Sequence, residues 1–180
     1  MGKLRKVSPG ALIAGIMFSD ADILKKVVEL LVEAFGSVEI ESPMFDFNMT
    51  DYYTAEMGKN LKKNFFCFTR PISLEALPDI KLLTNEIELK YSRKEKENPR
   101  RMVNIDPGYV TLSKLVLAST KDYSHRIFIG KGIFAEITLR FSRGTFIPLE
   151  TTYPDYRTSL AINYFNEVRE FVKRNRYQWT

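Results

Sequence analysis

The stretch LIAGIMFSDADILKKVVELLVEAFG, residues 12–36, predicts a strand that is followed directly by a helix. Residues 12–18 are almost entirely apolar and come after a Pro-Gly pair, a pattern typical of a short buried strand. In residues 19–34 the apolar side chains recur at helical spacing, which gives the helix one apolar face. Ser19 and Asp22 form a capping-box-like start, and the glycine after the helix supplies a left-handed stop.

Strands and helices continue to alternate in the segments that follow. Residues 38–47 have the pattern of an extended segment, and residues 64–72 are apolar on both faces, which predicts a central strand. Residues 78–91 fit a helix better than a strand, because their first half has no period of two. A short strand is expected at residues 102–106, ending at a turn at Pro107-Gly108.

This order of strand, helix, strand, strand, helix, strand predicts a ferredoxin-like split βαβ core. Residues 111–119 favour another helix, although their apolar run also suits a strand. The apolar stripe of residues 161–172 predicts a C-terminal helix that packs on the sheet. We therefore expect a single α+β domain over residues 1–180, with a mixed or antiparallel sheet, helices packed on it and an added β-hairpin.

The hairpin is expected around the Gly-Lys-Gly turn at residues 130–132. A three-residue turn keeps the apolar side chains on one face and places Ile127 opposite Ala135, whereas a two-residue turn would mix the faces. In this register Arg126 faces Glu136. That pair is expected to be a cross-strand salt bridge first and a catalytic couple only second.

The composition is that of a globular protein of ordinary domain size. Of 180 residues, 44% are hydrophobic and 27% are charged, which is unlike a disordered or membrane protein. No apolar stretch is long enough to cross a bilayer, so we expect no membrane partner. The only cysteine, Cys67, lies in an apolar strand-like run and is expected to be a buried thiol, which favours a reducing compartment and hence the cytoplasm.

The net charge of +5 is modest and comes largely from residues 93–101 and from the termini. A solvated basic loop explains this run. RNA-binding surfaces usually interleave aromatic side chains with their basic residues, and the run has none. Nucleic acid is therefore not the expected partner.

The sequence context rules out several cofactor motifs. The turn at residues 130–132 begins a match to the dinucleotide pattern G-x-G-x-x-A, but an alternating strand follows where that motif requires a helix. The chain has no phosphate-cradling P-loop and no haem motif. One histidine, His125, and one cysteine, Cys67, cannot build a usual zinc site within one chain. Asp106, Asp122, Glu136 and Asp155 offer oxygen ligands that would suit magnesium or calcium, although nothing in their spacing requires a metal. Asp106 and Glu136 are the expected ligands, and magnesium is the expected ion.

Reactive residues are concentrated in three runs, at residues 104–109, 121–126 and 153–157. These runs mix tyrosines and charges of both signs with glycine and proline, and they include the only histidine. Such mixtures are costly to bury and are not typical of a plain solvated helix face. The sequence therefore predicts that the three runs form one site.

The residue types in these runs suit a small anionic ligand, such as a nucleotide or another phosphate compound. Basic side chains would bind the anion, tyrosines would stack on a ring, and a carboxylate would complete the polar contacts. The expected ligand-binding residues are Lys121, Arg126, Lys131, Arg157, Tyr109, Tyr153, Tyr156 and Asp155. If the protein is an enzyme, Asp122 and His125 would form its acid–base pair, because a carboxylate can orient a histidine for proton transfer.

Two alternatives remain open at this point. The polar runs could instead fix turns in a non-catalytic module that binds a protein or RNA partner. In residues 153–157, the aromatic side chains could form a plug that anchors the final helix. The sequence does not decide between an enzyme and a binding protein.

Taken together, the motifs resemble a prokaryotic family, domain of unknown function 4416. The resemblance covers nearly the whole chain. It is carried by residues 15–20, 50–53, 56–58, 84–86, 104–109, 120–122, 125–127, 135–136 and 153–157. Some members of this family are labelled GTP-binding, although this chain has no P-loop. The resemblance adds the polar, tyrosine-rich loop at residues 50–58 to the candidate site, with Asp51 and Tyr52 as contributors.

Overall fold

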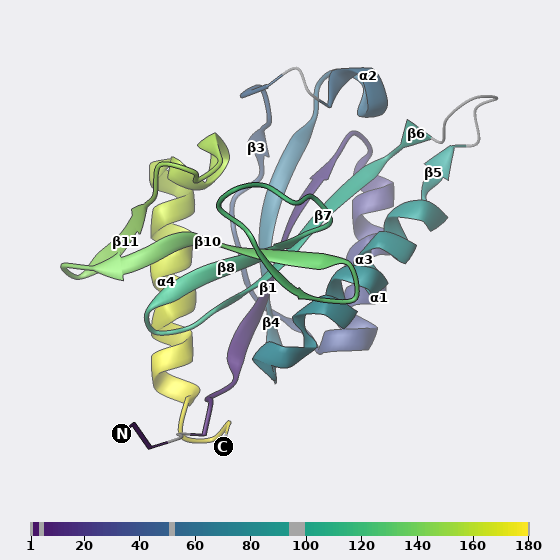
Figure 1. Ribbon diagram of the computed structural model, residues 1–180. Coiled ribbons are helices and arrows are strands. Elements are labelled where there is room, and N and C mark those ends of the chain that lie inside the picture. Colours follow the sequence, from purple (N-terminus) through teal and green to yellow (C-terminus); the bar gives the residue numbers. More distant parts are fainter. Residues whose placement is uncertain (1, 4–5, 51–52, 94–99, 180) are drawn as a thin grey trace.

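The computed structural model describes residues 2–3, 6–50, 53–93 and 100–179. One large antiparallel sheet forms its centre, with helices on both faces (Figure 1). The helices α1 (Ala21–Phe35) and α3 (Leu77–Lys90) cover one face, and the C-terminal helix α4 (Ser159–Asn175) covers the other. This arrangement confirms the predicted α+β class.

The first half of the chain forms the predicted ferredoxin-like core. Its strands are β1 (Gly10–Phe18), β2 (Val38–Glu41), β4 (Lys62–Ile72) and β7 (Val103–Val110), and they lie in the order β7-β1-β4-β2. Each neighbouring pair is antiparallel. The helix α1 links β1 to β2 and α3 links β4 to β7, as a split βαβ unit requires.

Four further strands extend this core beyond β7. They are β8 (Lys114–Ser119), β9 (Ile127–Gly130), β10 (Ile133–Ser142) and β11 (Thr145–Pro148). Strand β8 pairs with β7 and then with β10, while β9 and β11 pair with successive parts of the opposite edge of β10. The extension places the loop before β9 beside the loop after β11, where Arg126 donates to Tyr153 at 2.6 Å.

The described short elements complete the fold. They are β3 (Phe45–Asp46), which pairs with β4, the helical turn α2 (Thr54–Met57), the 3-10 turns η1 (Leu74–Ala76) and η2 (Pro154–Arg157), and the two-stranded β5 (Ser92–Arg93) and β6 (Arg100–Arg101). No helix in the described ranges is long and apolar enough to cross a membrane.

Strand β1 explains how a single sheet supports two cores. Its side chains alternate, so that Ala11 and Ile13 pack towards α4 while Leu12 and Ile16 pack towards α1 and α3. All four are fully buried. A fully buried aliphatic side chain stabilises a fold by about 1.5–3 kcal/mol, so the uninterrupted apolar run is required by the strand's central position.

The place of β4 in the sheet and the end of α1 are as predicted, but the start of α1 is not. Strand β4 is central, as predicted, because it lies between β1 and β2. At the start of α1 the capping residue is Asp20, whose carboxylate accepts a hydrogen bond from the Asp22 N–H at 2.9 Å. The expected capping role of Ser19 is therefore wrong. Gly36 ends the helix with a φ of 84°, as predicted.

The prediction of a helix at residues 111–119 is wrong, since residues 114–119 form strand β8. Its apolar side chains are buried on both sheet faces: Leu115 and Leu117 pack towards α4, and Val116 and Ala118 pack on the opposite face. A short apolar run without polar interruptions has the same pattern in a buried strand and a buried helix. Only the pairing of residues 114–119 with β7 and β10 shows that they form a strand.

The hairpin between β9 and β10 has the shorter of the two turns considered, followed by the pairing that was predicted for the longer one. The turn has two residues, Lys131 and Gly132, which both have positive φ angles, of 54° and 75°. The expected three-residue turn is therefore wrong. A bulge that leaves Ile129 unopposed then shifts the register, so that Ile127 still lies opposite Ala135 as predicted.

The predicted turn at Pro107-Gly108 is also wrong, because β7 runs straight through both residues. Proline has no N–H to donate, and the pairing of β8 with β7 begins only at Gly108, after the proline. A Cβ atom at Gly108 would lie 2.3 Å from the carbonyl oxygen of Val116. The glycine is thus required by the close approach of β8, and not by a turn.

We predict that Gly108→Ala destabilises the protein by about 1–3 kcal/mol or more, because backbone atoms of β8 must move to admit the methyl group. At Gly10, by contrast, an added Cβ would lie 3.0 Å from a flexible Leu74 side-chain carbon, and the nearest backbone atom, the Val110 oxygen, would be 3.2 Å away. Gly10→Ala should therefore cost clearly less. Urea unfolding of both variants checks this prediction, and an equal loss in the two would contradict it.

Candidate functional site

The three predicted runs converge on one cavity of about 460 Å³ on the α4 side of the sheet. Residues 104–109 contribute Asp106, residues 121–126 contribute Lys121 and Tyr123, and residues 153–157 contribute four residues. We call this cavity the tyrosine pocket. Its lining residues are Met17, Phe47, Met49, Thr50, Tyr53, Lys63, Asp106, Lys121, Tyr123, Tyr153, Pro154, Asp155 and Tyr156.

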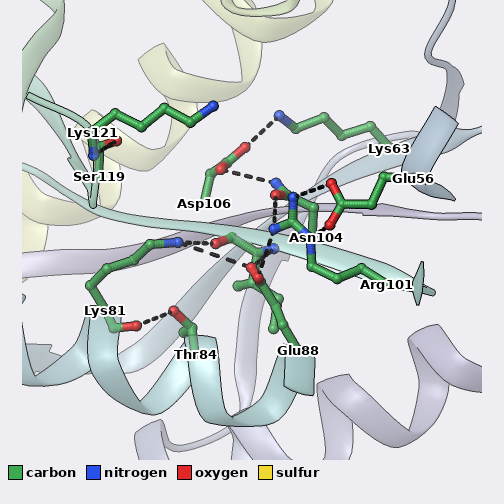
Figure 2. Close-up of polar contacts among 11 residues, drawn as sticks. Glu56, Lys63, Lys81, Thr84, Glu88, Arg101, Asn104, Asp106, Ser119 and Lys121 are labelled. Atoms are coloured by element: carbon green, nitrogen blue, oxygen red, sulfur yellow. Dashed lines mark hydrogen bonds and ion pairs between the residues drawn. The ribbon is translucent and has the colours of Figure 1, made fainter. Parts of the chain in front are cut away.

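A buried lysine that the sequence analysis missed lies at the centre of this pocket. The ammonium group of Lys63 donates to Asp155 at 2.8 Å and to Asp106 at 3.1 Å. The Lys63 and Asp155 side chains are each only 4% exposed, whereas Asp106 is 30% exposed. In Figure 2 the Lys63 and Lys121 side chains point towards Asp106 from opposite sides.

The electrostatics keep Lys63 and Asp106 ionised. Burial alone would lower the pKa of Lys63, but the nearby Asp155, Tyr156 and Asp106 raise it well above its usual value. Burial alone would raise the pKa of Asp106, but the ammonium groups of Lys63 and Lys81 outweigh it and lower that pKa. Proton transfer within the Lys63–Asp106 pair is therefore disfavoured, and Asp106 presents a charged carboxylate to the pocket.

Aromatic rings surround the lysine. Its nitrogen lies 4.8 Å from the centre of the Tyr156 ring and 5.7 Å from the centre of the Phe47 ring, within the range of cation–π attraction. The Tyr156 side chain is fully buried, and its hydroxyl has no hydrogen-bond partner among the described residues. Gly15 makes room for Tyr156 and Lys63, since a Cβ there would lie 2.6 Å from the Tyr156 hydroxyl and 3.0 Å from the Lys63 side chain.

The phenols of Tyr53 and Tyr153 are neutral. Burial, followed by the charge of Asp106, raises the pKa of Tyr53 well above its usual value. Burial also raises the pKa of Tyr153, although the guanidinium of Arg126 partly opposes it. These tyrosines therefore offer hydroxyl groups that donate and accept hydrogen bonds, and they add no negative charge.

Asp106 is held from behind by a second group of charges. Asn104 donates to Asp106 at 3.0 Å, and Arg101 donates to the Asn104 side-chain oxygen at 3.2 Å. The same guanidinium binds Glu56 through two nitrogens and Glu88 at 3.0 Å (Figure 2). This network connects the helical turn α2 to the wall of the pocket.

Side chains from α3 replace a missing strand at this part of β7. The pairing of β8 covers only residues 108–110 of β7, so the backbone at Ile105 needs other partners. Glu88 accepts from the Ile105 N–H at 2.6 Å, and Lys81 donates to the Ile105 carbonyl at 2.8 Å. Both side chains are buried, and burial raises the pKa of Glu88 although Lys81 opposes it.

Arg126 joins the two loops that form the outer wall. Its guanidinium is buried and donates to Glu136 at 3.0 Å, to Tyr153 at 2.6 Å and to Ser119 at 2.8 Å. It also donates to the carbonyl of Lys121 at 3.0 Å. The expected cross-strand pair with Glu136 is confirmed, and Arg126 acts on the pocket by positioning Lys121 and Tyr153.

The residues of the expected acid–base pair, Asp122 and His125, do not line the tyrosine pocket. The structure gives His125 a different carboxylate, Glu136, at 2.7 Å, while Asp122 is exposed. His125 also lines a second, mostly apolar cavity of about 690 Å³ beside η1 and the start of α3, which we call the apolar groove. Tyr109 lines the same groove and not the tyrosine pocket.

Two other predicted cations make local contacts. Lys131 pairs with Asp79 at an exposed position on the hairpin turn. Arg157 donates to the backbone carbonyls of Leu149, Glu150 and Thr152, and so holds the loop before η2. Neither residue lines the tyrosine pocket.

The remaining expectations concern metal binding and the loop at residues 50–58. In the described ranges no group of three or more His, Cys, Asp or Glu side chains is placed to hold a metal ion. Asp106 and Glu136, the expected metal ligands, are instead bound to Lys63 and to Arg126. Asp51 and Tyr52 lie outside the described residues, but Thr50 and Tyr53 on either side of them line the pocket.

Comparison with known proteins identifies the family. The family model for the domain of unknown function DUF4416 matches residues 8–171. The chain belongs to this family. Each of the three runs that meet at the tyrosine pocket lies within the matched DUF4416 region. No curated protein and no solved structure matches the chain.

We predict that Lys63→Met lowers the free energy of unfolding by about 3–5 kcal/mol at pH 7, because it leaves two carboxylates close together without a counter-ion. The loss should shrink as the pH falls. In the wild type, Asp106 has a lowered pKa, so its ion pair stabilises the fold above pH 3.8 and is lost below it. In the variant, protonation removes the repulsion.

Lys62→Met is the matched control, since Lys62 is the exposed neighbour on the same strand. Urea unfolding at neutral and acidic pH measures both variants. A similar small loss in the two would contradict the prediction, since it would show that Asp106 and Asp155 do not require Lys63 as their counter-ion.

We further predict that Arg157→Ala destabilises the protein by about 1–2 kcal/mol, because three backbone carbonyls lose a charged donor. Arg140→Ala, at an exposed arginine of β10, should have little effect. Thermal unfolding compares them. Unchanged stability in Arg157→Ala would contradict the anchoring role.

Proposed function

We propose that this protein binds a small ligand that combines an aromatic ring with an anionic group, as a nucleotide does, in the tyrosine pocket. The observation that carries this proposal is the convergence of three separate polar and aromatic runs on one cavity. Its volume of about 460 Å³ lies within the usual range for small-molecule sites. We also propose a cytoplasmic location, since Cys67 is a buried free thiol.

The aromatic lining supports a ring. Phe47, Tyr53, Tyr123 and Tyr153 surround the cavity, and flat side chains of this kind bind planar ligands by stacking and edge contacts. Tyr53 and Tyr153 also offer neutral hydroxyl groups. The ionised carboxylate of Asp106, which is partly exposed to the cavity, suits N–H donors at the edge of a heterocycle.

The distribution of charge supports an anionic group at the rim. The positive charge of Lys63 lies deep in the pocket and is shared between Asp106 and Asp155. Lys121 is exposed at the mouth, where it faces both the cavity and solvent. A ligand with its ring among the tyrosines and its phosphate beside Lys121 would place opposite charges together.

Binding, and not catalysis, is the activity that we propose. The candidate acid–base residues His125 and Asp122 do not line the tyrosine pocket. The rival function, an interaction module for a protein or RNA partner, would leave the pocket without a small ligand.

We predict that nucleoside monophosphates raise the melting temperature of the purified protein, since ligand at a hundred times its Kd adds about 2.7 kcal/mol to stability. The parent nucleosides and inorganic phosphate should bind more weakly. Tyr123→Ala should weaken nucleotide binding about 5- to 100-fold, the range found when a stacking side chain is removed. Calorimetric titration measures these affinities.

The variant Lys121→Met tests the contact with the ligand's anionic group separately from the contact with its ring. It should reduce nucleotide affinity towards that of the nucleoside, whereas Lys114→Met, in the apolar groove, should leave binding unchanged. The proposal fails if nucleotides, nucleosides and phosphate all leave the melting temperature unchanged. It also fails if the pocket variants bind as the wild type does.

A further inference from the structure

The apolar groove is a second cavity with the dimensions of a ligand site. It lies on the α3 side of the sheet, where Val116 of β8, Ala135 of β10 and Leu77 of α3 line it. Its volume of about 690 Å³ falls in the usual range for small-molecule sites. It has no described lining residue in common with the tyrosine pocket, so a ligand of that pocket does not occupy it.

Aliphatic side chains surround the groove and are left open to solvent. Ile127 is 69% exposed, Val7 is 68% exposed and Ile137 is 47% exposed, and all three line the cavity. Removing apolar surface from water is favourable in proportion to the area covered. The groove therefore suits a ligand with an apolar body, which would cover side chains that the fold itself leaves exposed.

Two basic side chains lie together at this groove. Lys114 lines it, and Arg140 is directly opposite Lys114 in the pairing of β8 with β10. Residues that are directly opposite share one face of a sheet, and like charges in this position destabilise it. Among the described residues, neither side chain has an ion-pair or hydrogen-bond partner. A bound anion would relieve their repulsion.

The acidic residues of the groove leave these two cations to a ligand. The carboxylate of Glu136 is already bound to Arg126 and to His125. Glu75 of η1 also lines the groove, but it is exposed and forms no ion pair with a cation in the described ranges. The charge that complements Lys114 must therefore come from outside the chain.

We propose that the apolar groove binds a free medium-chain carboxylic acid in its ionised form. Its alkyl chain would lie among the exposed aliphatic side chains, and its carboxylate would lie between Lys114 and Arg140. An arginine can bind a carboxylate through two parallel N–H bonds, and a lysine adds a point charge. This second ligand site does not rest on the function proposed for the tyrosine pocket.

Calorimetric titration with octanoate, octanol and acetate tests both parts of this ligand. Octanoate should bind, octanol should bind about fivefold more weakly because it lacks the charge, and acetate should not bind measurably because it lacks the chain. In the double variant Lys114→Met, Arg140→Gln, the affinity for octanoate should fall to that for octanol. Lys25→Met, at an exposed lysine of α1, is the matched control and should bind octanoate as the wild type does.

Two further readings locate the alkyl chain. Ile127→Ser should weaken octanoate and octanol by the same factor, whereas the double variant should weaken octanoate alone. In spectra of ¹³C-labelled isoleucine methyl groups, octanoate should shift Ile127, Ile129 and Ile137, which line the groove. Ile23 and Ile162, which do not line it, should be unchanged.

Several results would overturn the proposal. They are the absence of octanoate binding, equal binding of octanoate and octanol, wild-type affinity in the double variant, and methyl shifts outside the groove. If the double variant is poorly folded by circular dichroism, Lys114→Met alone replaces it. Cosedimentation with phosphatidylglycerol vesicles in the absence of octanoate binding would assign the groove to a membrane surface, and would also overturn the proposal.

Discussion

The site depends on how β7 loses its partner strand at Pro107. On the N-terminal side of Pro107, β8 does not pair with β7, and the backbone of Ile105 is hydrogen-bonded instead to Glu88 and Lys81 of α3. These side chains allow β7 to remain a strand without a neighbour on that edge. On the opposite face of the sheet, the loop that follows β8 brings Lys121 to a cavity that Asp106 also lines.

Buried charge is the second requirement of this arrangement. An isolated lysine at the position of Lys63 would be strongly disfavoured, but Asp106 and Asp155 come from two other segments and pair with it. Such pairs are weak evidence for stability, because desolvation offsets their attraction. They do fix geometry, since β4, β7 and η2 must meet in one arrangement for the lysine to be satisfied.

The sequence predicted the parts of the fold that have a clear period, and it predicted the runs that line the candidate pocket but not the lysine at its centre. The ferredoxin-like core and the convergence of three runs follow from patterns along the chain. Residues 114–119 did not, because a uniformly apolar run does not distinguish strand from helix. Lys63 was missed because it looks like an ordinary polar residue at the end of strand β4. Its partners, Asp106 and Asp155, lie 43 and 92 residues away along the sequence.

Methionine methyl NMR would show whether the tyrosine pocket is the ligand site. Met17 and Met49 line the pocket, whereas Met44 and Met102 do not. With ¹³C-labelled methionine methyl groups and added nucleoside monophosphate, we expect shifts at Met17 and Met49 from the ring current of a bound base, with Met44 and Met102 unchanged. Shifts confined to Met44 or Met102, or no shift at saturating nucleotide, would contradict it.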